Sequence, residues 1–357
     1  MNIFKKISLF ALTAMVCVFS VVFFGCGKAD PNVINLSEVT HSTFYAPLYV
    51  AINNGYFKDE GLTINLTNGG GSNNSMSALV SDAANIVLVG PETVVYTQQE
   101  GIKDKPVVIG QLTQTDGAFI VARNYTKDVS TFTLDELKGE SIIGGREGGL
   151  PAMTLQYVIE RGANLTTGTN KAAGEVDLIS NVEFNAIGST FVSRTDVKYC
   201  TLFEPTATQF VNESNGDYKL IAPVGKFLTE NVPYTCFVTK ESFVKNNSTQ
   251  AEKFLTAVAK GYKFLEKCVR ENQLDKAAEA LLPSFNGMTK AELGIAIKQY
   301  VNINAWTANP AMTESSYNKL IDITANAGKI LGKGVTYIGV VDNKIANIVN
   351  TKVIKID

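Results

Sequence analysis

The sequence predicts an α/β protein of two lobes with mainly parallel sheets and two hinge crossings. The chain has 357 residues, which suits two lobes of about 100–150 residues each better than one small core. Short apolar segments alternate with helix-like segments, as is typical of β-α-β units. Because this alternation occurs in two blocks, we expect the chain to leave the first lobe, build a second one and return.

The first part of lobe 1 is expected over residues 33–114. Each predicted strand there is a short apolar run, and the turn that follows it contains Gly, Asn or Pro. A helix over 46–54 ends at Gly55, the residue type that commonly caps a helix C-terminus. Pro91 suits the start of a later helix. The predicted strands are 33–37, 62–66, 85–89 and 106–112.

Lobe 2 is expected over residues 115–233, and residues 234–357 are expected to return to lobe 1. The return begins with a strand at 233–239, and a mostly helical region follows from Ser248 onward. We expect its helices to pack back on lobe 1, beside the hinge made by the two crossings. The predicted strands of lobe 2 are 119–122, 141–144, 175–179, 198–203 and 218–223, and the predicted C-terminal helices are 251–270, 274–281, 290–301 and 315–327.

Residues 1–25 read as a secretion signal. Lys5 and Lys6 precede an apolar run over 7–24, which is the arrangement of a signal peptide. Cys26 follows a small residue and resembles the cysteine of a bacterial lipobox, although Phe23 departs from the usual Leu. We expect Cys26 to be lipidated and residues 26–32 to form a tether. The alternative is an uncleaved anchor, since the run is nearly long enough to span a bilayer.

Composition and motifs argue against several function classes. A formal net charge of −2 and the lack of a basic run interleaved with aromatics give no sign of a nucleic-acid partner. The single histidine excludes two-histidine zinc motifs, and the serine-hydrolase, P-loop and dinucleotide spacings are missing. We therefore expect no enzyme, no cofactor and no metal. Cys200, Cys236 and Cys268 lack metal-ligand spacing and are expected to be buried free thiols.

Five strand-to-helix turns carry polar or glycine-rich residues. They are the turns at 41–45, 69–73, 90–92, 144–149 and 203–205. Ligands of open parallel sheets bind where strands end and helices begin, and free N–H groups there favour polar or anionic groups. Gly, Asn and Pro also make ordinary turns and caps. Five such turns at one edge nevertheless favour a ligand site.

We expect the ligand to contact residues from these turns and from the crossings. Glu92 and Glu204 each lie at a helix start, where the dipole alone explains a carboxylate. The functional alternative is that they face each other across the cleft and accept ligand N–H groups. Arg146 either grips an anionic group or pairs with Glu147. The expected ligand-binding residues are His41, Ser42, Tyr45, Asn73, Pro91, Glu92, Asp116, Arg146, Glu147, Glu204 and Tyr234.

Two stretches near the start of the body carry a family resemblance. HSTFYAPLYVA at 41–51 and NGYFKDEGL at 54–62 resemble solute-binding proteins of ABC importers, of the nitrate, sulfonate, taurine and thiamine-pyrimidine-precursor type. Residues 90–92, 144–146 and 203–206 resemble a bacterial subgroup. Asn85 and the Asn73–Asn74 pair stand where Asp is common. The resemblance implies a two-lobed periplasmic-binding-protein-like fold, the Venus flytrap, that closes on its ligand.

The resemblance also implies partners and a location. We expect a monomer on the outer face of the cell membrane, held by its lipid anchor, which passes a small solute to an ABC permease and its ATPase. The solute is expected to be a polar N-heterocycle or amine such as a thiamine pyrimidine precursor, because a carboxylate pairs well with an aminopyrimidine edge and tyrosines such as Tyr45 or Tyr234 stack on rings. The alternatives are a small anion (sulfonate, taurine or nitrate), a pyrimidine-precursor synthase-like enzyme, and a receptor lobe that docks to a sensor.

Overall fold

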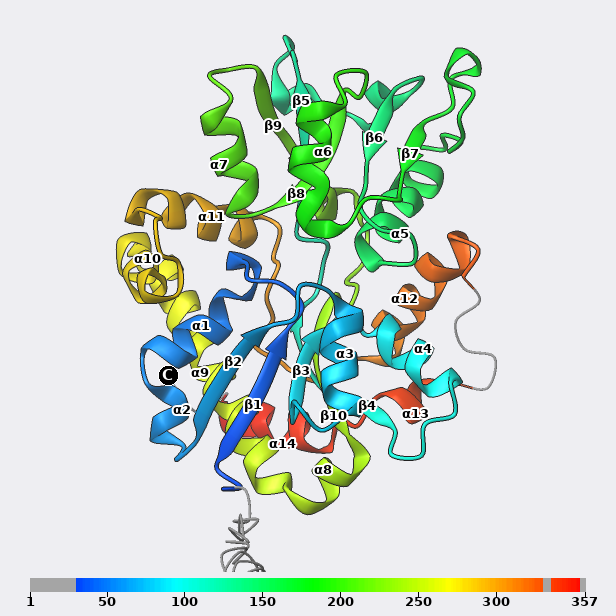
Figure 1. Cartoon of the computed structure of the whole chain (residues 1–357). Coiled ribbons are helices and arrows are strands. Elements are labelled where there is room, and N and C mark those ends of the chain that lie inside the picture. Colours follow the sequence, from blue (N-terminus) through cyan, green and yellow to red (C-terminus); the bar gives the residue numbers. More distant parts are fainter. Residues whose placement is uncertain (1–29, 330–334, 354–357) are drawn as a thin grey trace, which may run out of the picture. The chain divides into compact units, whose positions relative to one another are not determined.

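The computed structural model describes residues 30–329 and 335–353. The predicted signal segment and Cys26 lie outside these residues. Within the described ranges, no helix has both the length and the apolar character needed to cross a bilayer. The described chain contains two separate five-stranded sheets with helices around each (Figure 1).

The sheet of the first lobe has the strand order β2-β1-β3-β10-β4. Strand β1 pairs in parallel with β2 and β3, whereas β10 pairs antiparallel with β3 and β4. All four residues of β3 are buried, as expected for a central strand covered on both faces. The strands are β1 (Val33–Glu38), β2 (Thr63–Asn68), β3 (Ile86–Val89), β4 (Pro106–Thr113) and β10 (Thr235–Lys240).

The sheet of the second lobe has the order β7-β6-β8-β5-β9. Strand β6 pairs in parallel with β7 and β8, and β5 pairs antiparallel with β8 and β9. The two sheets thus share one arrangement although their sequences differ. The strands are β5 (Ala118–Arg123), β6 (Ser141–Ile143), β7 (Asp177–Ile179), β8 (Tyr199–Phe203) and β9 (Tyr218–Pro223).

The predicted two-lobed α/β fold is confirmed, and its sheets are mixed rather than mainly parallel. In each sheet two pairings are parallel and two are antiparallel. The reason is the crossing itself. Strands β5 and β10 each begin at a crossing and run away from it, whereas their neighbours run toward the edge where the lobes meet. A strand that enters a sheet from this edge must pair antiparallel with them.

The two crossings form a hinge held by hydrogen bonds. The backbone N–H of Val232 donates to Gln114 O at 2.9 Å, and the N–H of Tyr234 donates to Thr113 O at 3.1 Å. The Tyr234 hydroxyl donates to Asp116 Oδ2 at 2.7 Å. Burial raises the pKa of Asp116, and the hydrogen bonds that its carboxylate accepts lower it. Burial has the larger effect, so the pKa rises to about 7.

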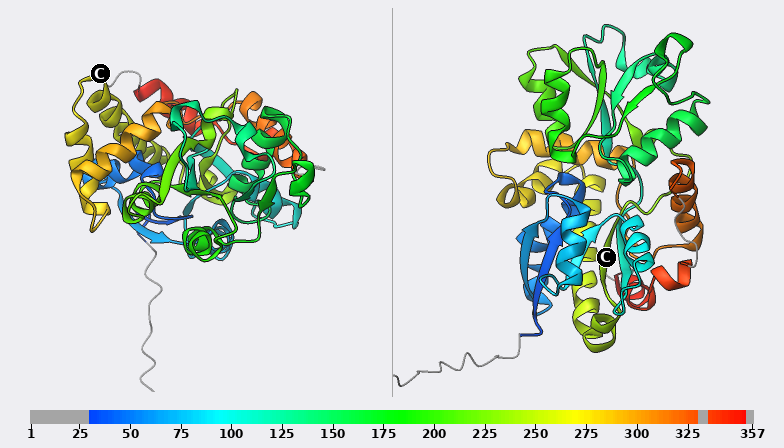
Figure 2. Two further views of the ribbon diagram at one scale, coloured as in Figure 1. Left: turned by 90° about the horizontal axis from the view of Figure 1, so that it is seen from above. Right: turned by 45° about the vertical axis from the view of Figure 1, so that its right-hand side comes forward.

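Helix α9 (Ser248–Arg270) is the longest element that packs on the first lobe. Its buried residues recur at helical spacing, including Ala251, Phe254, Leu255 and Val258, so one face of the helix is apolar. Gly261 permits the close crossing of α9 over α1 (Ala46–Asn53), because a Cβ there would lie 2.1 Å from Pro47 O. In both views of Figure 2, the yellow helices of the region around residues 260–280 lie beside the blue N-terminal elements of the first lobe.

Helix α12 (Glu314–Asn326) differs from the expectation that the C-terminal helices return to lobe 1. It packs on α5 (Leu150–Tyr157) of the second lobe. Lys319 Nζ donates to the Tyr157 hydroxyl at 3.0 Å, and Asn326 Nδ2 donates to Glu160 Oε2 at 2.7 Å. The polar groups of α12 therefore find partners across the lobe boundary, which a helix pattern alone does not encode.

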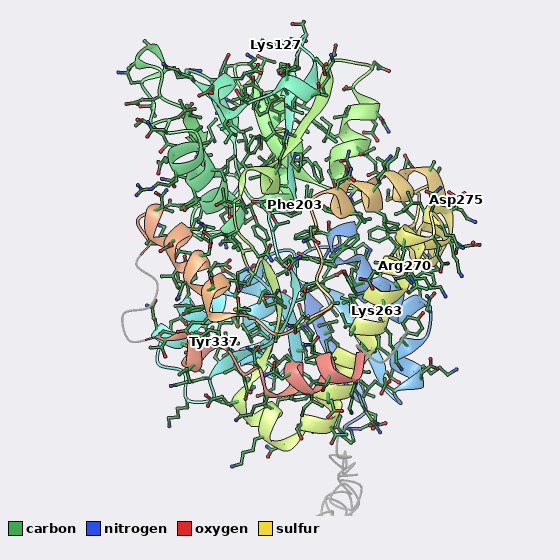
Figure 3. The ribbon with its side chains drawn as sticks, turned by 180° about the vertical axis from the view of Figure 1, so that it is seen from behind. Lys127, Phe203, Lys263, Arg270, Asp275 and Tyr337 are labelled. Carbon is green, nitrogen blue, oxygen red and sulfur yellow. The ribbon has the colours of Figure 1, made fainter. Side chains whose placement is uncertain are left out.

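The remaining helices complete the two lobes. Figure 3 shows the molecule from behind, with Phe203 labelled between the lobes and Lys263, Arg270 and Asp275 on the side of α9 and α10. The helices are α2 (Tyr56–Asp59), α3 (Ser72–Val80), α4 (Glu92–Gln99), α6 (Ile187–Ser193), α7 (Thr206–Glu213), α8 (Glu241–Asn246), α10 (Leu274–Leu281), α11 (Lys290–Asn302), α13 (Tyr337–Val340) and α14 (Lys344–Val353).

Candidate ligand-binding site

A cavity of about 270 Å³ lies where the carboxyl ends of strands from both sheets meet. The first lobe contributes the segments after β1, β2 and β3, and the second lobe those after β6, β7 and β8. This is the position at which open α/β sheets bind ligands. The lining residues are Val39, Thr40, Phe44, Tyr45, Gly70, Gly71, Ser72, Asn73, Asn74, Gly90, Glu92, Gly145, Arg146, Gly149, Leu150, Pro151, Glu183, Phe184, Phe203, Tyr234 and Thr235.

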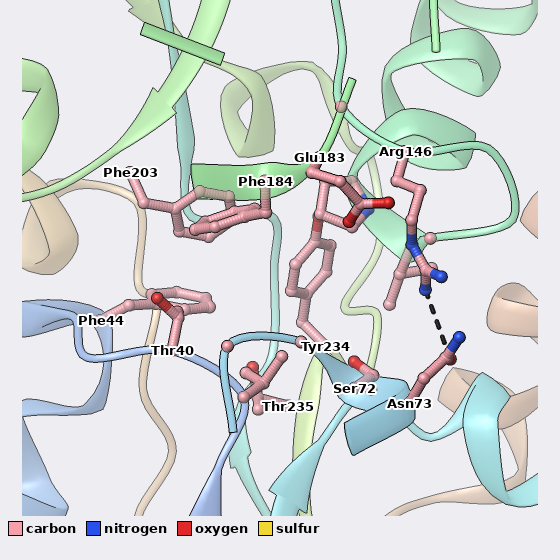
Figure 4. A pocket seen from close by; sticks show the side chains of 18 of the residues that line it. Thr40, Phe44, Ser72, Asn73, Arg146, Glu183, Phe184, Phe203, Tyr234 and Thr235 are labelled. Atoms are coloured by element: carbon pink, nitrogen blue, oxygen red, sulfur yellow. Dashed lines mark hydrogen bonds between the residues drawn. The ribbon is translucent and has the colours of Figure 1, made fainter. Parts of the chain in front are cut away.

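One end of the cavity is aromatic (Figure 4). The rings of Phe44 and Phe203, from different lobes, meet edge to face with centroids 5.5 Å apart. Phe184 lies 5.2 Å from Phe203, and Tyr234 lies 6.0 Å from Phe44. Such a wall suits a flat ring, because offset and edge-to-face contacts with a ligand ring are favourable.

Glu92 is a buried carboxyl group beside this wall. It is the first residue of α4 and is 3 % exposed, and its Oε2 has no hydrogen-bond partner. Burial raises the pKa of Glu92 to about 7, although backbone hydrogen bonds at Glu92 and Leu150 and the charge of Arg146 oppose the rise. The side chain folds back over Gly90, where an added Cβ would lie 2.2 Å from Oε2. Gly90 thus makes room for the carboxyl group.

Arg146 lies at the other, polar end of the cavity. It comes from the loop after β6, and its Nη2 donates to Asn73 Oδ1 of the first lobe over a long 3.4 Å. Figure 4 shows Arg146 and Glu183 side by side, with Asn73 across the gap. Asn73 lies in the first turn of α3, whose cap residue Gly71 offers no capping side chain. Backbone N–H groups of this turn therefore remain available.

The described residues contain no cluster of histidine, cysteine and carboxylate side chains suited to a metal ion. Cys200, Cys236 and Cys268 are free and buried, as the sequence predicts. Burial raises the pKa of the Cys200 and Cys236 thiols, which keeps them protonated and unreactive. The cavity can therefore bind a molecule through rings, one buried carboxyl group and one guanidinium.

Comparison with known proteins assigns the chain to a family. The model of the NMT1/THI5 like family matches residues 42–267. The chain belongs to this family. A Bacillus subtilis (strain 168) relative named "Putative binding protein YtlA" is 35% identical over 319 residues, which are 89% of this chain and 90% of the relative.

Solved structures share the fold of this family member. The periplasmic nitrate-binding protein NrtA of Synechocystis PCC 6803 superposes with a TM-score of 0.65 at 15% identity, covering 90% of this chain and 85% of NrtA. The alkanesulfonate-binding protein SsuA of Xanthomonas axonopodis pv. citri, bound to MOPS, gives a TM-score of 0.63 at 14% identity and covers 88% of this chain and 99% of SsuA. At this identity the likeness shows the periplasmic-binding-protein fold.

Five of the predicted ligand-binding residues lie together in the cavity. Tyr45, Asn73, Glu92, Arg146 and Tyr234 all belong to its lining. They come from four turns of the five expected and from the second crossing. The sequence therefore located the edge of the sheets at which the cavity lies, and the binding role of each residue stays a prediction.

Glu204 does not face Glu92 across the cavity, contrary to the prediction. Its carboxylate accepts the Thr208 N–H at 3.0 Å and the Thr208 hydroxyl at 2.7 Å. Burial raises the pKa of Glu204 above its ordinary value, and these two hydrogen bonds oppose the rise. The reason for the difference is local, because a donor side chain stands in the first turn of α7, where the carboxylate reaches it.

His41 and Ser42 lie beside the cavity but hold the fold together. His41 Nδ1 lies 2.7 Å from Glu38 Oε1, and its Nε2 lies 2.7 Å from Ser284 O. The hydrogen bond to Glu38 raises the pKa of His41, while partial burial opposes the rise. Ser42 Oγ donates to Glu204 O at 2.6 Å and so joins the two lobes.

Three further predicted residues lie outside the lining. Asp116 belongs to the hinge and accepts from Tyr234, which itself lines the cavity. Pro91 is the residue before α4 and sets the start of that helix. Glu147 is exposed and pairs with Lys329 at 2.7 Å, not with Arg146.

Sequence reasoning missed further lining residues, among them the aromatic residues Phe44, Phe184 and Phe203. Phe44 and Phe203 lie in the marked turns at 41–45 and 203–205 but are not among the expected ligand-binding residues. Glu183 and Phe184 follow β7 in a stretch with no clear pattern, which the structure folds as a short 3-10 turn. The available signal was their position directly after parallel strands.

Proposed function

We propose that this chain is the substrate-binding component of an ABC importer, and that it binds a small N–H-bearing heterocycle such as a thiamine pyrimidine precursor. The family match over residues 42–267 and the shared fold with binding proteins support the transport role. In this role the lobes close on the solute, and the closed form is handed to a permease and its ATPase. The protein performs no chemistry on the solute.

The observation that carries the ligand class is the unsatisfied oxygen of Glu92. A carboxyl oxygen buried without a partner costs free energy, and a ligand N–H group placed against it recovers that cost. The aromatic end of the cavity supplies the complementary surface for a flat ring. A ring with N–H groups on its edge satisfies both features.

A small anion is the second candidate, and Arg146 is the observation that favours it. NrtA and SsuA are named for nitrate and alkanesulfonates, and Arg146 is a cation at the cavity. Two carboxyl groups, Glu92 and Glu183, line the same cavity and repel a simple anion. The charge balance therefore favours the N–H-bearing ligand.

Export and lipid anchoring belong to the same proposal. The sequence pattern around Cys26 supports anchoring to the outer face of the cell membrane, and a monomer tethered there fits a protein that delivers solute to a permease. The described body begins at β1 only a few residues after this cysteine, so the tether is short.

The test is ligand binding by a Glu92→Gln variant. We expect native mass spectrometry of the purified mature protein to reveal a nitrogen heterocycle, and titration calorimetry with an aminopyrimidine to show about tenfold or more weaker binding to Glu92→Gln. Glu204→Gln is the matched control, because its carboxylate lies outside the cavity, and we expect it to bind like wild type. An unchanged affinity of Glu92→Gln, or tight binding of nitrate or a sulfonate alone, would contradict the proposal.

A further inference from the structure

The charged groups that line the cavity do not form ion pairs with one another. Arg146, Glu92 and Glu183 all line the cavity, yet none of them forms an ion pair in the part of the chain that the structure describes. Charges elsewhere on the molecule do pair, as Lys260 does with Glu60 at 2.6 Å. The cavity thus keeps separate charges of both signs.

Separated charges in a cleft between two lobes are costly unless something pairs with them. Burial of a carboxyl group disfavours its charged form, which the raised pKa of Glu92 reflects, and its Oε2 has no hydrogen-bond partner. Within residues 30–329 and 335–353, the only hydrogen bond of the Arg146 guanidinium is the long one to Asn73, a neutral amide. A solute that carries a donor for Glu92 and an acceptor for Arg146 satisfies both at once.

The surroundings of Arg146 fit an acidic group. The first turn of α3, a nine-residue helix, contributes Ser72, Asn73 and Asn74 to the lining, and no side chain caps its start. Free N–H groups and the positive end of the helix dipole favour an anion there. Arg146 approaches the same turn from the other lobe, so an acidic group between them would touch both lobes.

We propose that the solute carries an acidic group, a carboxylate or a phosphate, in addition to its N–H-bearing ring. The ring lies against Phe44, Phe184 and Phe203, an N–H group meets Glu92, and the acidic group lies between Arg146 and the start of α3. This inference rests on the proposed function and narrows its substrate class. The volume of about 270 Å³ suits one ring with one such substituent.

The arrangement also explains how simple anions are rejected. Nitrate or a short sulfonate offers an acceptor to Arg146 but no donor to Glu92, so the buried oxygen of Glu92 stays unsatisfied. A neutral ring without the acidic group satisfies Glu92 but leaves Arg146 with its weak contact. Only the combined ligand uses both lobes fully.

The experiment compares matched ligands and matched variants. The probes are an aminopyrimidine with a hydroxymethyl group, the same compound phosphorylated on that hydroxyl, and an analogue with a carboxylate there. Titration calorimetry on wild type should show the phosphate or the carboxylate form binding at least tenfold more tightly than the neutral form, and the stronger of the two identifies the acid. Arg146→Ala should reduce this preference to about twofold, and Arg146→Lys should restore part of it. Glu92→Gln should weaken all three forms by a similar factor.

The failures of the two proposals are distinguishable. Equal binding of neutral and acidic forms to wild type, or an unchanged preference in Arg146→Ala, overturns the acidic-group inference and leaves the proposed function in place. Affinities that do not depend on Glu92 overturn the proposed function itself. The compound that co-purifies with wild type gives a second readout that does not depend on the probes. If its mass shows that it has no acidic group, the inference is overturned even where no probe binds.

Discussion

Glu92 and Glu204 both lie between a buried strand and the helix that follows it, but their side chains have opposite environments. Glu92 follows the cap residue Pro91 and is the first residue of α4, whereas Glu204 precedes the cap residue Pro205 of α7. Glu92 has an oxygen with no partner and lines the cavity, whereas both oxygens of Glu204 accept hydrogen bonds from Thr208. The comparison separates a carboxyl group available to a ligand from one that stabilises the fold.

The residue four positions later makes the difference. Thr208 offers a hydroxyl and a backbone N–H to Glu204, while the residue four positions after Glu92 is Tyr96, whose hydroxyl lies 3.5 Å from Gly148 O. A third carboxylate, Glu38 at the end of β1, resembles Glu204, because His41 and Tyr49 both bond to it. Of these three glutamates, Glu92 is thus the one that has a buried carboxyl oxygen without a hydrogen-bond partner among the described residues.

The largest expected effect is on the pH dependence of stability. Because the pKa of Glu92 rises to about 7 in the folded protein, the folded state holds this proton more tightly than the unfolded chain does. The free energy of unfolding of the ligand-free protein should therefore fall as pH rises from about 4.5 to 7, by up to about 3 kcal/mol from this group. Glu92→Gln should lose that part of the slope.

Chemical denaturation of both proteins from pH 4.5 to 8 measures this difference. Asp116 has a pKa of about 7 as well and gives a slope of the same sign, but it remains in both proteins and cancels in the comparison. Parallel stability curves for wild type and Glu92→Gln would show that Glu92 is not the unsatisfied group described above.

The next effect is the stability contribution of Glu204. Glu204→Ala removes the acceptor of two Thr208 donors in a buried setting, and an unmade buried hydrogen bond costs about 1–3 kcal/mol. We expect the free energy of unfolding at pH 7 to fall by about 2 kcal/mol, with ligand affinity changed less than twofold. This is the opposite pattern to Glu92→Gln, which should weaken binding and not destabilise the protein.

A double-mutant cycle with Thr208→Val checks that the two residues act through each other. The combined variant should be no more than about 0.5 kcal/mol less stable than Glu204→Ala alone. Additive losses of stability would show that Glu204 and Thr208 act independently. A tenfold loss of ligand affinity in Glu204→Ala would place Glu204 in the ligand site.

The sequence predicted the fold and the edge of the sheets that carries the cavity, and it did not predict which side chains turn inward. The five polar turns follow from strand and helix periodicity, which is local information. The direction of the Glu204 side chain depends on Thr208, and that of the Arg146 side chain depends on Asn73 of the other lobe. The Glu183–Phe184 segment reaches the cavity through the order β7-β6-β8 of the second sheet. These outcomes depend on contacts between distant segments, which periodicity does not encode.

The smallest expected effect concerns His41, whose bond to Glu38 makes that carboxylate a structural one. The pKa of His41 is raised above 6.5 because Glu38 accepts its proton in a hydrogen bond. Its stabilising contribution is therefore complete below about pH 6.5 and is lost as pH rises through the raised folded pKa. Since the His41 side chain is 35% exposed, solvent screening limits the effect to less than about 1 kcal/mol. Unfolding of wild type and His41→Gln at pH 6 and pH 9 should show the larger difference at pH 6, and ligand affinity should be the same in both proteins. A stability difference between the two proteins that grows toward pH 9 would show that the hydrogen bond to Glu38 does not raise the pKa of His41. A loss of ligand binding in His41→Gln would place His41 in the ligand site and remove the contrast between Glu38 and Glu92.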